Sequence, residues 1–262
     1  MASPLLASLR LSNVDALAAA EAAPRTTCLH CNHKMKYYCY NCQRPLIPNT
    51  PHLTLPIHLD IVHHPTEKLS KSTAIAARIL APETSTWFEY PANIPAYDPA
   101  ETILLFPAPN ARRLADFPDL AKYKRVVCVE SVWSKANGVA AHPHLRDLPK
   151  AVISCEETLF WRYQNISDTN LSTIEAIFYF YRDYITCTRG EYRHEVDDLL
   201  WFFSHIYNKV QRFYIEHPDK QFTHKEGYIK YDTPRADAPA AAAPAAEGEP
   251  PAKEAPKEEA TN

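Results

Sequence analysis

The sequence has no long hydrophobic run. Nowhere in its 262 residues does a stretch approach the ~20 consecutive apolar residues that a membrane-spanning helix needs. Hydrophobic residues make up 46% of the chain, which is enough for a globular core. We therefore expect a soluble protein with no membrane contact.

A strong net charge is also missing, since the formal value is −3. Asp232 to Asn262 holds seven acidic and three basic residues, which leaves 25 basic and 24 acidic residues, about +1, for the rest. Recognition of a polyanion depends on clustered charge rather than on the sum, so this balance neither favours nor excludes a nucleic-acid partner.

The sequence shows no secretory signal, and its seven cysteines are an odd number. Four of them lie in two close pairs, which favours a reducing compartment and metal binding over disulfides. Residues 1–25 carry only Arg10 and Arg25 as positive charges, a poor transit peptide. We expect this segment to be a disordered leader or one weak amphipathic helix.

Two CxxC pairs, separated by seven residues, supply Cys28, Cys31, Cys39 and Cys42. Four thiolates suit tetrahedral Zn²⁺, and such a closed site is structural because it leaves no open coordination position. The spacing is shorter than in common zinc ribbons, so His30 or His33 remains an alternative to one thiolate. Four unmetallated thiols are the other alternative. We predict a zinc knuckle over residues 26–46.

Short apolar segments alternate with helical patterns in the middle of the chain. We predict strands at residues 57–63, 102–106, 126–129 and 151–155, and helices at residues 70–80, after residue 110 with Arg112 and Arg113, and at residues 135–141. This alternation indicates an α/β fold with a parallel sheet.

The last third of the chain is predicted to form two helices followed by a flexible tail. Ser172 and Glu175 form a capping box for a helix that runs to residue 185, and a second helix over residues 196–214 carries one apolar face. We expect this second helix to pack against the sheet. From residue 227 to residue 262 the Pro/Ala/Glu-rich chain is predicted to be a disordered appendage.

The segment from Arg125 to Lys135 combines a buried strand with reactive side chains. Its apolar run is followed by a carboxylate, a hydroxyl, an indole and an ammonium group, which belong to Glu130, Ser131, Trp133 and Lys135. Open α/β sheets bind ligands at this end of their strands. The alternative is a strand that simply ends in solvated polar residues.

Several short motifs follow one another in a characteristic order: the cysteine pairs, then residues 59–67, 71–75, 104–107, 130–133, 160–162 and 171–176. In this order, from Cys28 to about Tyr214, the chain resembles the DTW-domain family of tRNA-uridine aminocarboxypropyltransferases, in its eukaryotic type with a four-cysteine knuckle. The resemblance implies a catalytic domain over residues 54–226 with a fold related to SPOUT methyltransferases, including a carboxy-terminal trefoil knot.

The resemblance also implies a reaction and a location. Such an enzyme moves the 3-amino-3-carboxypropyl group of S-adenosylmethionine to N3 of a uridine in the D-loop of tRNA and releases methylthioadenosine. We expect a monomer in the nucleus or the cytoplasm, and the resemblance favours the nucleus.

The resemblance assigns roles to individual side chains. Glu130 is the candidate base for the N3 proton, unless it only caps the next helix or pairs with Lys135. Trp133 would stack on a flipped uracil or fill the core. The cofactor would be held by Leu105, Phe106, Pro107, Ser172, Thr173 and Glu175. The cofactor carboxylate or tRNA phosphates would be held by Arg162, Lys135, Arg112 and Arg113, each of which is alternatively a solvated charge. Glu67 would bind the cofactor ammonium or brace its loop.

The sequence departs from the family in the motif that names it. The pattern Asp-x-Thr-Trp is replaced by Glu130, Ser131, Val132 and Trp133, and a family glycine is Ala108. Glu130 moves the carboxylate outward by one methylene, and Val132 loses a hydroxyl group. Two alternatives to the transferase therefore stay open: an inactive or weakened relative that binds RNA, and an S-adenosylmethionine-dependent RNA methyltransferase.

Overall fold

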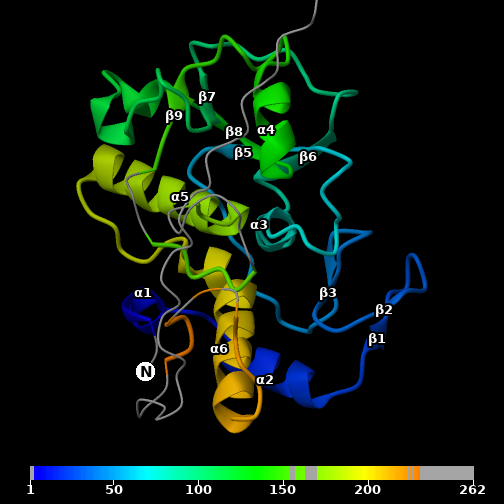
Figure 1. The fold of residues 1–262 in the computed structure, drawn as a ribbon. Coiled ribbons are helices and arrows are strands. Elements are labelled where there is room, and N and C mark those ends of the chain that lie inside the picture. Colours follow the sequence, from blue (N-terminus) through cyan, green and yellow to red (C-terminus); the bar gives the residue numbers. More distant parts are fainter. Residues whose placement is uncertain (1–2, 154–156, 163–169, 224, 226, 231–262) are drawn as a thin grey trace, which may run out of the picture. The chain divides into compact units, whose positions relative to one another are not determined.

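The computed structural model describes residues 3–153, 157–162, 170–223, 225 and 227–230 (Figure 1). One compact unit extends to Lys230. The predicted appendage lies outside the described residues from residue 231 onward. In the part of the chain that the structure describes, no helix is both long and apolar enough to cross a membrane.

A five-stranded sheet with the order β6-β5-β8-β7-β9 forms the centre of this unit (Figure 1). All neighbouring strands are parallel, which confirms the predicted α/β class. His63 pairs with Glu130, so the two central strands end at the same level. The strands are β5 (His58–His63), β6 (Ser85–Glu89), β7 (Thr102–Leu105), β8 (Arg125–Glu130) and β9 (Lys150–Ala151).

Helices cover both faces of the sheet. Val139 of α4 packs with Val127 of β8 on one face. Successive side chains of a strand point to opposite faces, so Cys128 and Glu130 face away from α4, toward α5. There α5 packs on β8 and α3 packs on α5. The helices are α3 (Ala74–Leu80), α4 (Trp133–Ala140), α5 (Thr173–Arg189) and α6 (Trp201–Glu216).

The predicted capping box at the start of α5 is confirmed. The backbone amide and hydroxyl group of Ser172 donate hydrogen bonds of 2.8 and 2.6 Å to the Glu175 carboxylate. The second predicted helix is the short helix η3 (Asp197–Leu200) followed by α6. Because α5 already covers this face of the sheet, α6 packs mainly on η3 and on α2 (Val14–Ala22) rather than on the sheet, which corrects the expected packing.

Two regions of the sheet edge differ from the prediction. Arg112 is not helical: its amide donates to the carbonyl of Lys150 and its carbonyl accepts from Val152, each at 2.9 Å. This extended segment therefore continues the sheet beside β9, and only then do the short helices η1 (Leu114–Asp116) and η2 (Leu120–Lys122) form. Edge strand β6 was not predicted, because its central residues are half-buried and mix polar with apolar types. The fourth predicted strand is reduced to β9, and its positions 154 and 155 lie outside the described residues.

The segment before the knuckle forms two helices, α1 (Pro4–Ser8) and α2 (Val14–Ala22), where we expected a disordered leader or one helix. Buried carboxylates hold it in place. The amide of Arg10 donates to Asp197 at 2.6 Å, and that of Ser12 donates to Asp198 at 2.8 Å. The composition of the segment gives no sign of these contacts, because the acceptors lie almost at the other end of the compact unit.

The knuckle consists of two short antiparallel hairpins. In one, β1 (Thr26–Thr27) pairs with β2 (Lys34–Met35), and in the other β3 (Tyr38–Cys39) pairs with β4 (Arg44–Pro45). The buried side chains between them are Cys28, Met35 and Cys39. A core this small needs additional stabilisation, as a bound metal would supply.

Candidate active site and metal centre

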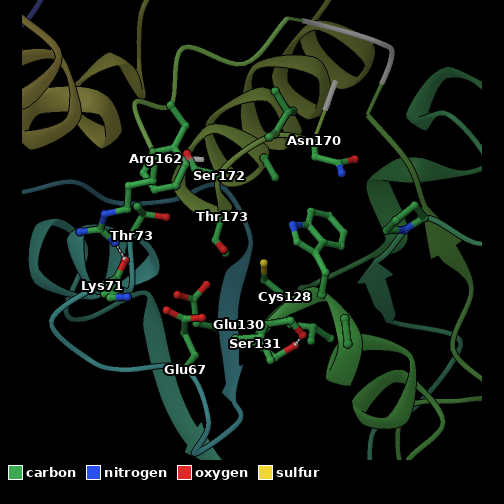
Figure 2. A pocket seen from close by; sticks show the side chains of 18 of the residues that line it. Glu67, Lys71, Thr73, Cys128, Glu130, Ser131, Arg162, Asn170, Ser172 and Thr173 are labelled. Carbon is green, nitrogen blue, oxygen red and sulfur yellow. Dashed lines mark hydrogen bonds between the residues drawn. The ribbon is translucent and has the colours of Figure 1, made fainter. Parts of the chain in front are cut away.

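A cavity of about 1240 Å³ opens where β7 and β8 end and where α4 and α5 begin (Figure 2). This is the strand end at which the sequence predicts a ligand. Nine of the predicted site residues line it: Glu67, Leu105, Phe106, Pro107, Glu130, Trp133, Arg162, Ser172 and Thr173. The fold thus brings together motifs that are spread over more than a hundred residues of sequence.

Glu130 is the last residue of β8, and only 3% of its surface is exposed. Its Oε2 atom has no hydrogen-bond partner among the described residues. Burial raises the pKa of this carboxyl group, while the nearby hydroxyl groups of Ser72 and Thr173 partly oppose the rise. Within the described chain Glu130 forms neither an ion pair with Lys135 nor a cap on α4, so the structure supports neither structural alternative for this side chain.

A second carboxylate, that of Glu67, points toward the same part of the cavity (Figure 2). Its loop is anchored by His63, whose Nε2 atom lies 2.8 Å from the carbonyl oxygen of Glu67. The Nδ1 atom of the same ring lies 2.8 Å from the carboxylate of Glu89 on β6. The edge strand therefore helps to fix the position of Glu67.

Arg162 places a cation beside these two carboxylates. Its Nη1 atom donates to the carbonyl oxygen of Lys71 at 2.6 Å, and its guanidinium group lies over the ring of Phe160. Burial lowers the pKa of Arg162, and the negative charges of Glu67 and Glu130 oppose that decrease. Lys71 also lines the cavity, so the cavity holds charges of both signs.

Aromatic side chains form much of the remaining wall. Trp133, the first residue of α4, is 39% exposed and lines the cavity, so it does not fill the core behind β8. The other aromatic lining residues are Phe106, Phe160, Trp161, Tyr214 and Phe222. Flat rings that line a cavity provide surfaces on which a nucleobase can stack, and Trp133 is the most exposed of them.

Glu175 does not line the cavity, which corrects its expected contact with a cofactor. It is fully buried and holds other lining segments in place. Besides Ser172, its carboxylate accepts hydrogen bonds from the hydroxyl group of Thr158 at 2.8 Å and from the amide of Leu159 at 2.7 Å. Burial raises the pKa of Glu175, and these donors oppose the rise.

Three predicted cationic residues also lie outside the cavity lining. Lys135 is exposed on α4, Arg112 lies at the sheet edge, and Arg113 forms an exposed ion pair of 3.5 Å with Asp116. Conversely, Lys71, Thr73 and Tyr214 line the cavity and were not predicted as site residues. Lys71 and Thr73 belong to the motif at residues 71–75, which was a usable signal, whereas Tyr214 follows the apolar spacing of α6 and resembles a core residue.

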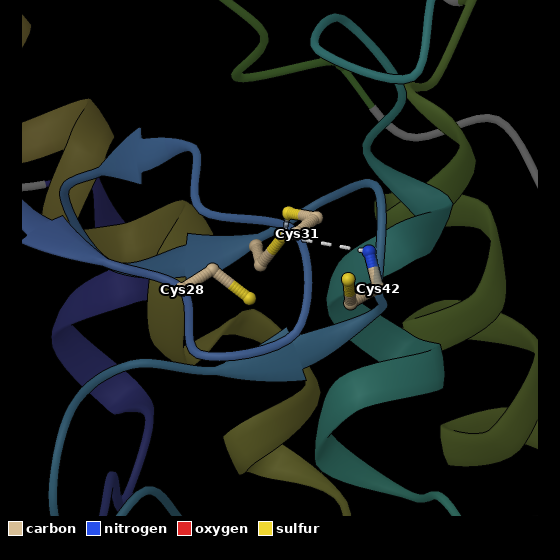
Figure 3. A group of neighbouring side chains, drawn as sticks. Cys28, Cys31 and Cys42 are labelled. Carbon is tan, nitrogen blue, oxygen red and sulfur yellow. Dashed lines mark hydrogen bonds between the residues drawn. The ribbon is translucent and has the colours of Figure 1, made fainter.

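The four knuckle cysteines come together as predicted (Figure 3). Their sulfur atoms all lie within 4.8 Å of one another, and those of Cys31 and Cys39 are 3.5 Å apart. Zn–S bonds of about 2.3 Å in a tetrahedron place sulfur atoms about 3.8 Å apart, so the cluster fits a zinc ion. The imidazole of His33 instead lies 2.9 Å from the carbonyl oxygen of Cys31, and His30 is not in the cluster.

The knuckle packs on α6 and reaches the cavity. Tyr38 contacts Phe202 edge to face at 4.8 Å between ring centroids. The next residue of α6, Phe203, packs on Trp161 of the cavity wall, with 5.3 Å between the ring centroids. The geometry of the knuckle is therefore linked to that of the cavity.

Glu21 of α2 fastens the other side of the knuckle. Its carboxylate accepts hydrogen bonds from Tyr37 and, at 2.6 Å, from Lys209, and lies 3.3 Å from His205. Burial by itself would raise the pKa of Glu21, but these hydrogen bonds together lower it to about 2. Helix α2, the knuckle and α6 thus meet at the carboxylate of Glu21.

Comparisons with known proteins agree with the motif order. The family model of the DTW domain matches residues 36–211. The chain is 32% identical to tRNA-uridine aminocarboxypropyltransferase 1 of Mus musculus over 255 residues, covering 79% of this chain and 84% of the mouse protein. The Homo sapiens protein of the same name gives the same identity and coverage. That of Xenopus tropicalis is 32% identical over 254 residues, covering 79% of this chain and 86% of the relative.

Among solved structures, the SAM-dependent rRNA:acp-transferase Tsr3 from Vulcanisaeta distributa aligns with 62% of this chain and 82% of its own length. The sequence identity is 16% and the TM-score is 0.33.

Proposed function

The chain belongs to the DTW-domain family, and on that premise we propose that it transfers the 3-amino-3-carboxypropyl group of S-adenosylmethionine to N3 of a uridine in tRNA. The N3–C bond would form as the C–S bond of the donor breaks, and methylthioadenosine would leave. The N3 proton has to depart in the same reaction, so the site needs a base near that nitrogen.

One observation carries this proposal: Glu130 lines the cavity, and its buried Oε2 atom has no hydrogen-bond partner among the described residues. A buried acceptor without a partner is costly, and the N3–H group of a uracil is a donor that would satisfy it. The raised pKa of Glu130 makes its carboxylate a stronger base than an exposed glutamate. We therefore assign the proton acceptor to Glu130.

Other lining residues would bind and orient the two substrates. The cavity of about 1240 Å³ exceeds the usual ~300–1,000 Å³ of a small-molecule site, which leaves room for a cofactor together with a nucleotide. Trp133 would stack on the uracil. Arg162 and Lys71 would bind the carboxylate of the transferred group, and Glu67 its ammonium. Leu105 to Pro107 and Ser172 with Thr173 would surround the rest of the donor.

Of the two departures from the family motif, we attribute that at Val132 to helix capping rather than to chemistry. Val132 occupies the N-cap position of α4, where no side-chain hydrogen bond forms. A threonine at an N-cap stabilises a helix because its hydroxyl oxygen accepts a hydrogen bond from a backbone N–H group of the first turn. The missing hydroxyl group therefore weakens the start of α4, and Val132 also lines the cavity, so a Val132→Thr variant decides whether that hydroxyl group matters for the chemistry.

The finer expectations remain part of the proposal. The four cysteines would bind Zn²⁺ as a structural ion. The modified uridine would lie in the D-loop, the catalytic domain would contain a trefoil knot near its carboxyl end, and the protein would act as a monomer in the nucleus. The cysteine cluster supports the zinc ion, and the other expectations rest on the family resemblance.

Cofactor labelled separately in its methyl and its aminocarboxypropyl groups tests the reaction. Purified protein is incubated with an unmodified tRNA transcript and each cofactor in turn. Label from the aminocarboxypropyl group in the tRNA supports the transferase, label from the methyl group supports a methyltransferase, and label from neither supports an inactive relative. Mass spectrometry of nuclease fragments then locates the modified uridine.

A further inference from the structure

The knuckle lies in a segment without acidic residues. From residue 22 to residue 59 the sequence contains no Asp or Glu, whereas the chain-wide frequency would give about four or five. The same segment has the ordinary share of cations: Arg25, Lys34, Lys36 and Arg44. Its positive charge therefore arises because acidic residues are absent rather than because basic ones are enriched.

Three of these four cations are available for a partner. Lys36 is occupied, since its Nζ atom donates to the carbonyl oxygens of Glu21 and Ala23 at the end of α2. Arg25, Lys34 and Arg44 are exposed, and their side chains have no ion pair or hydrogen bond with any residue that the structure describes. Some exposed cations elsewhere are paired, such as Arg193 beside Glu191.

The hairpins direct these charges outward. Thr27 pairs with Lys34, and Arg25 lies two residues before Thr27, so strand alternation places Arg25 and Lys34 on one face of the first hairpin. Arg44 lies on the second hairpin, and its side chain is exposed. With Zn²⁺ bound, the four thiolates leave two net negative charges, mostly buried, against four cations. The outer surface remains positive.

We propose that this knuckle face, defined by Arg25, Lys34 and Arg44, binds phosphate groups of the tRNA whose uridine enters the cavity. The inference rests on the proposed function for the identity of the RNA. The knuckle contacts α6 through Tyr38 and Phe202, and the adjacent Phe203 packs on Trp161 of the cavity wall, so an RNA strand with one base in the cavity continues close to the knuckle. The face carries a single strongly exposed apolar side chain, Leu29, which suits a polyanion better than a membrane surface.

The test compares two triple variants that remove the same charge from the full-length, metal-loaded protein. One is Arg25→Ala, Lys34→Ala, Arg44→Ala. The matched control is Lys124→Ala, Arg146→Ala, Arg193→Ala, whose exposed cations each pair with an acidic residue. Fluorescence anisotropy with a labelled tRNA transcript gives Kd at several salt concentrations, and metal content and thermal midpoint verify folding.

Loss of three phosphate contacts should raise Kd for tRNA about tenfold to a hundredfold and flatten the dependence of log Kd on log salt by about two to three units. The control should change Kd by less than about threefold. The maximal transfer rate at saturating tRNA should stay at the wild-type value.

A variant that keeps the three charges, Arg25→Lys, Lys34→Arg, Arg44→Lys, should bind tRNA with the wild-type Kd. If the triple variant fails to fold, the three single variants should each remove about one unit of the salt slope.

An unchanged Kd and salt slope in the folded triple variant would overturn the inference, even if the wild type transfers its group normally. Loss of binding to anionic phosphatidylserine vesicles with unchanged tRNA binding would likewise overturn it, in favour of a membrane surface. Absence of transfer by the wild type would refute the proposed function, but the tRNA affinities would still decide the role of the knuckle face.

Discussion

Glu67 and Glu130 face the same part of the cavity, and the negative charge of Glu67 adds to the burial that raises the pKa of Glu130 (Figure 2). The two carboxylates come from different parts of the chain. Glu67 lies in the loop after β5, and Glu130 is the last residue of β8. Their proximity couples the protonation of one to the charge of the other.

Replacing Glu67 with glutamine should therefore lower the pKa of Glu130. Because the proposed base acts in its ionised form, the acidic limb of the pH profile of kcat/KM should move to lower pH in Glu67→Gln. Transfer assays across a range of pH values measure the shift. An unchanged limb, with Glu191→Gln as a control for an exposed carboxylate, would contradict electrostatic coupling between the two groups.

Glu130→Gln should lower the transfer rate and, at pH 8, raise the unfolding temperature. Loss of a base typically slows a reaction about a hundredfold to ten-thousandfold, while tRNA affinity should change little. Since folding raises the pKa of Glu130 above 4.5, its favourable contribution is complete below that value and is lost as the pH rises through the folded-state pKa. The variant should therefore unfold at a higher temperature than the wild type at pH 8, and this difference should vanish near pH 4. Full transfer activity in Glu130→Gln would eliminate Glu130 as the base.

Val132→Thr should stabilise the protein by about 1 kcal/mol, because it supplies an N-cap hydroxyl group to α4. Urea unfolding monitored by circular dichroism measures the change. The transfer rate should remain within about twofold of the wild type if Val132 has only this local role. A large gain in rate would instead mean that the family hydroxyl group takes part in chemistry.

Removal of the metal should reduce transfer activity, because it loosens the knuckle that packs beside the cavity wall. Cys28→Ser should lose the ion, loosen the hairpins and release Tyr38 from its contact with Phe202 on α6. Metal analysis of protein purified without chelator should give about one zinc per chain for the wild type and for Cys187→Ser, whose exposed cysteine lies on α5. Zinc far below that level in the wild type would refute the metal centre.

Glu21→Gln should destabilise the protein near neutral pH. Folding lowers the pKa of Glu21 from 4.5 to about 2, so its contribution is present above pH 4.5 and is lost as the pH falls toward 2. The difference in urea midpoint between wild type and variant should narrow over that range. A difference that persists at pH 2 would point to packing rather than to charge.

The sequence predicted the elements whose burial pattern is local. Strands β5 and β8 have apolar cores, and α5 has its capping box within four residues. By contrast, edge strand β6 and the extended segment at Arg112 depend on pairing with strands that are distant in sequence. Local propensity has no access to such pairing.

The same contrast between local and distant information explains which residues of the candidate site could be predicted. Glu130, Arg162 and Ser172 were found because each belongs to a short motif. Lys135 was misplaced because its direction depends on where α4 begins, two residues earlier than predicted. The side chains of α6 were taken as core, yet Val210 and Tyr214 line the cavity because α6 packs beside α2 and η3 and leaves their face toward it.

The attachment of the segment before the knuckle constrains the order of events during synthesis. Arg10 and Ser12 bind acceptors 187 and 186 residues further along the chain, and Trp201 donates to the carbonyl oxygen of Ser12 at 2.7 Å. A ribosome that adds ~5–20 residues per second needs on the order of ten seconds or more to supply these partners. Arg10 and Ser12 therefore leave the ribosome well before their partners and reach their final position late. Glu21 of α2 likewise meets Lys209 only after α6 has been synthesised.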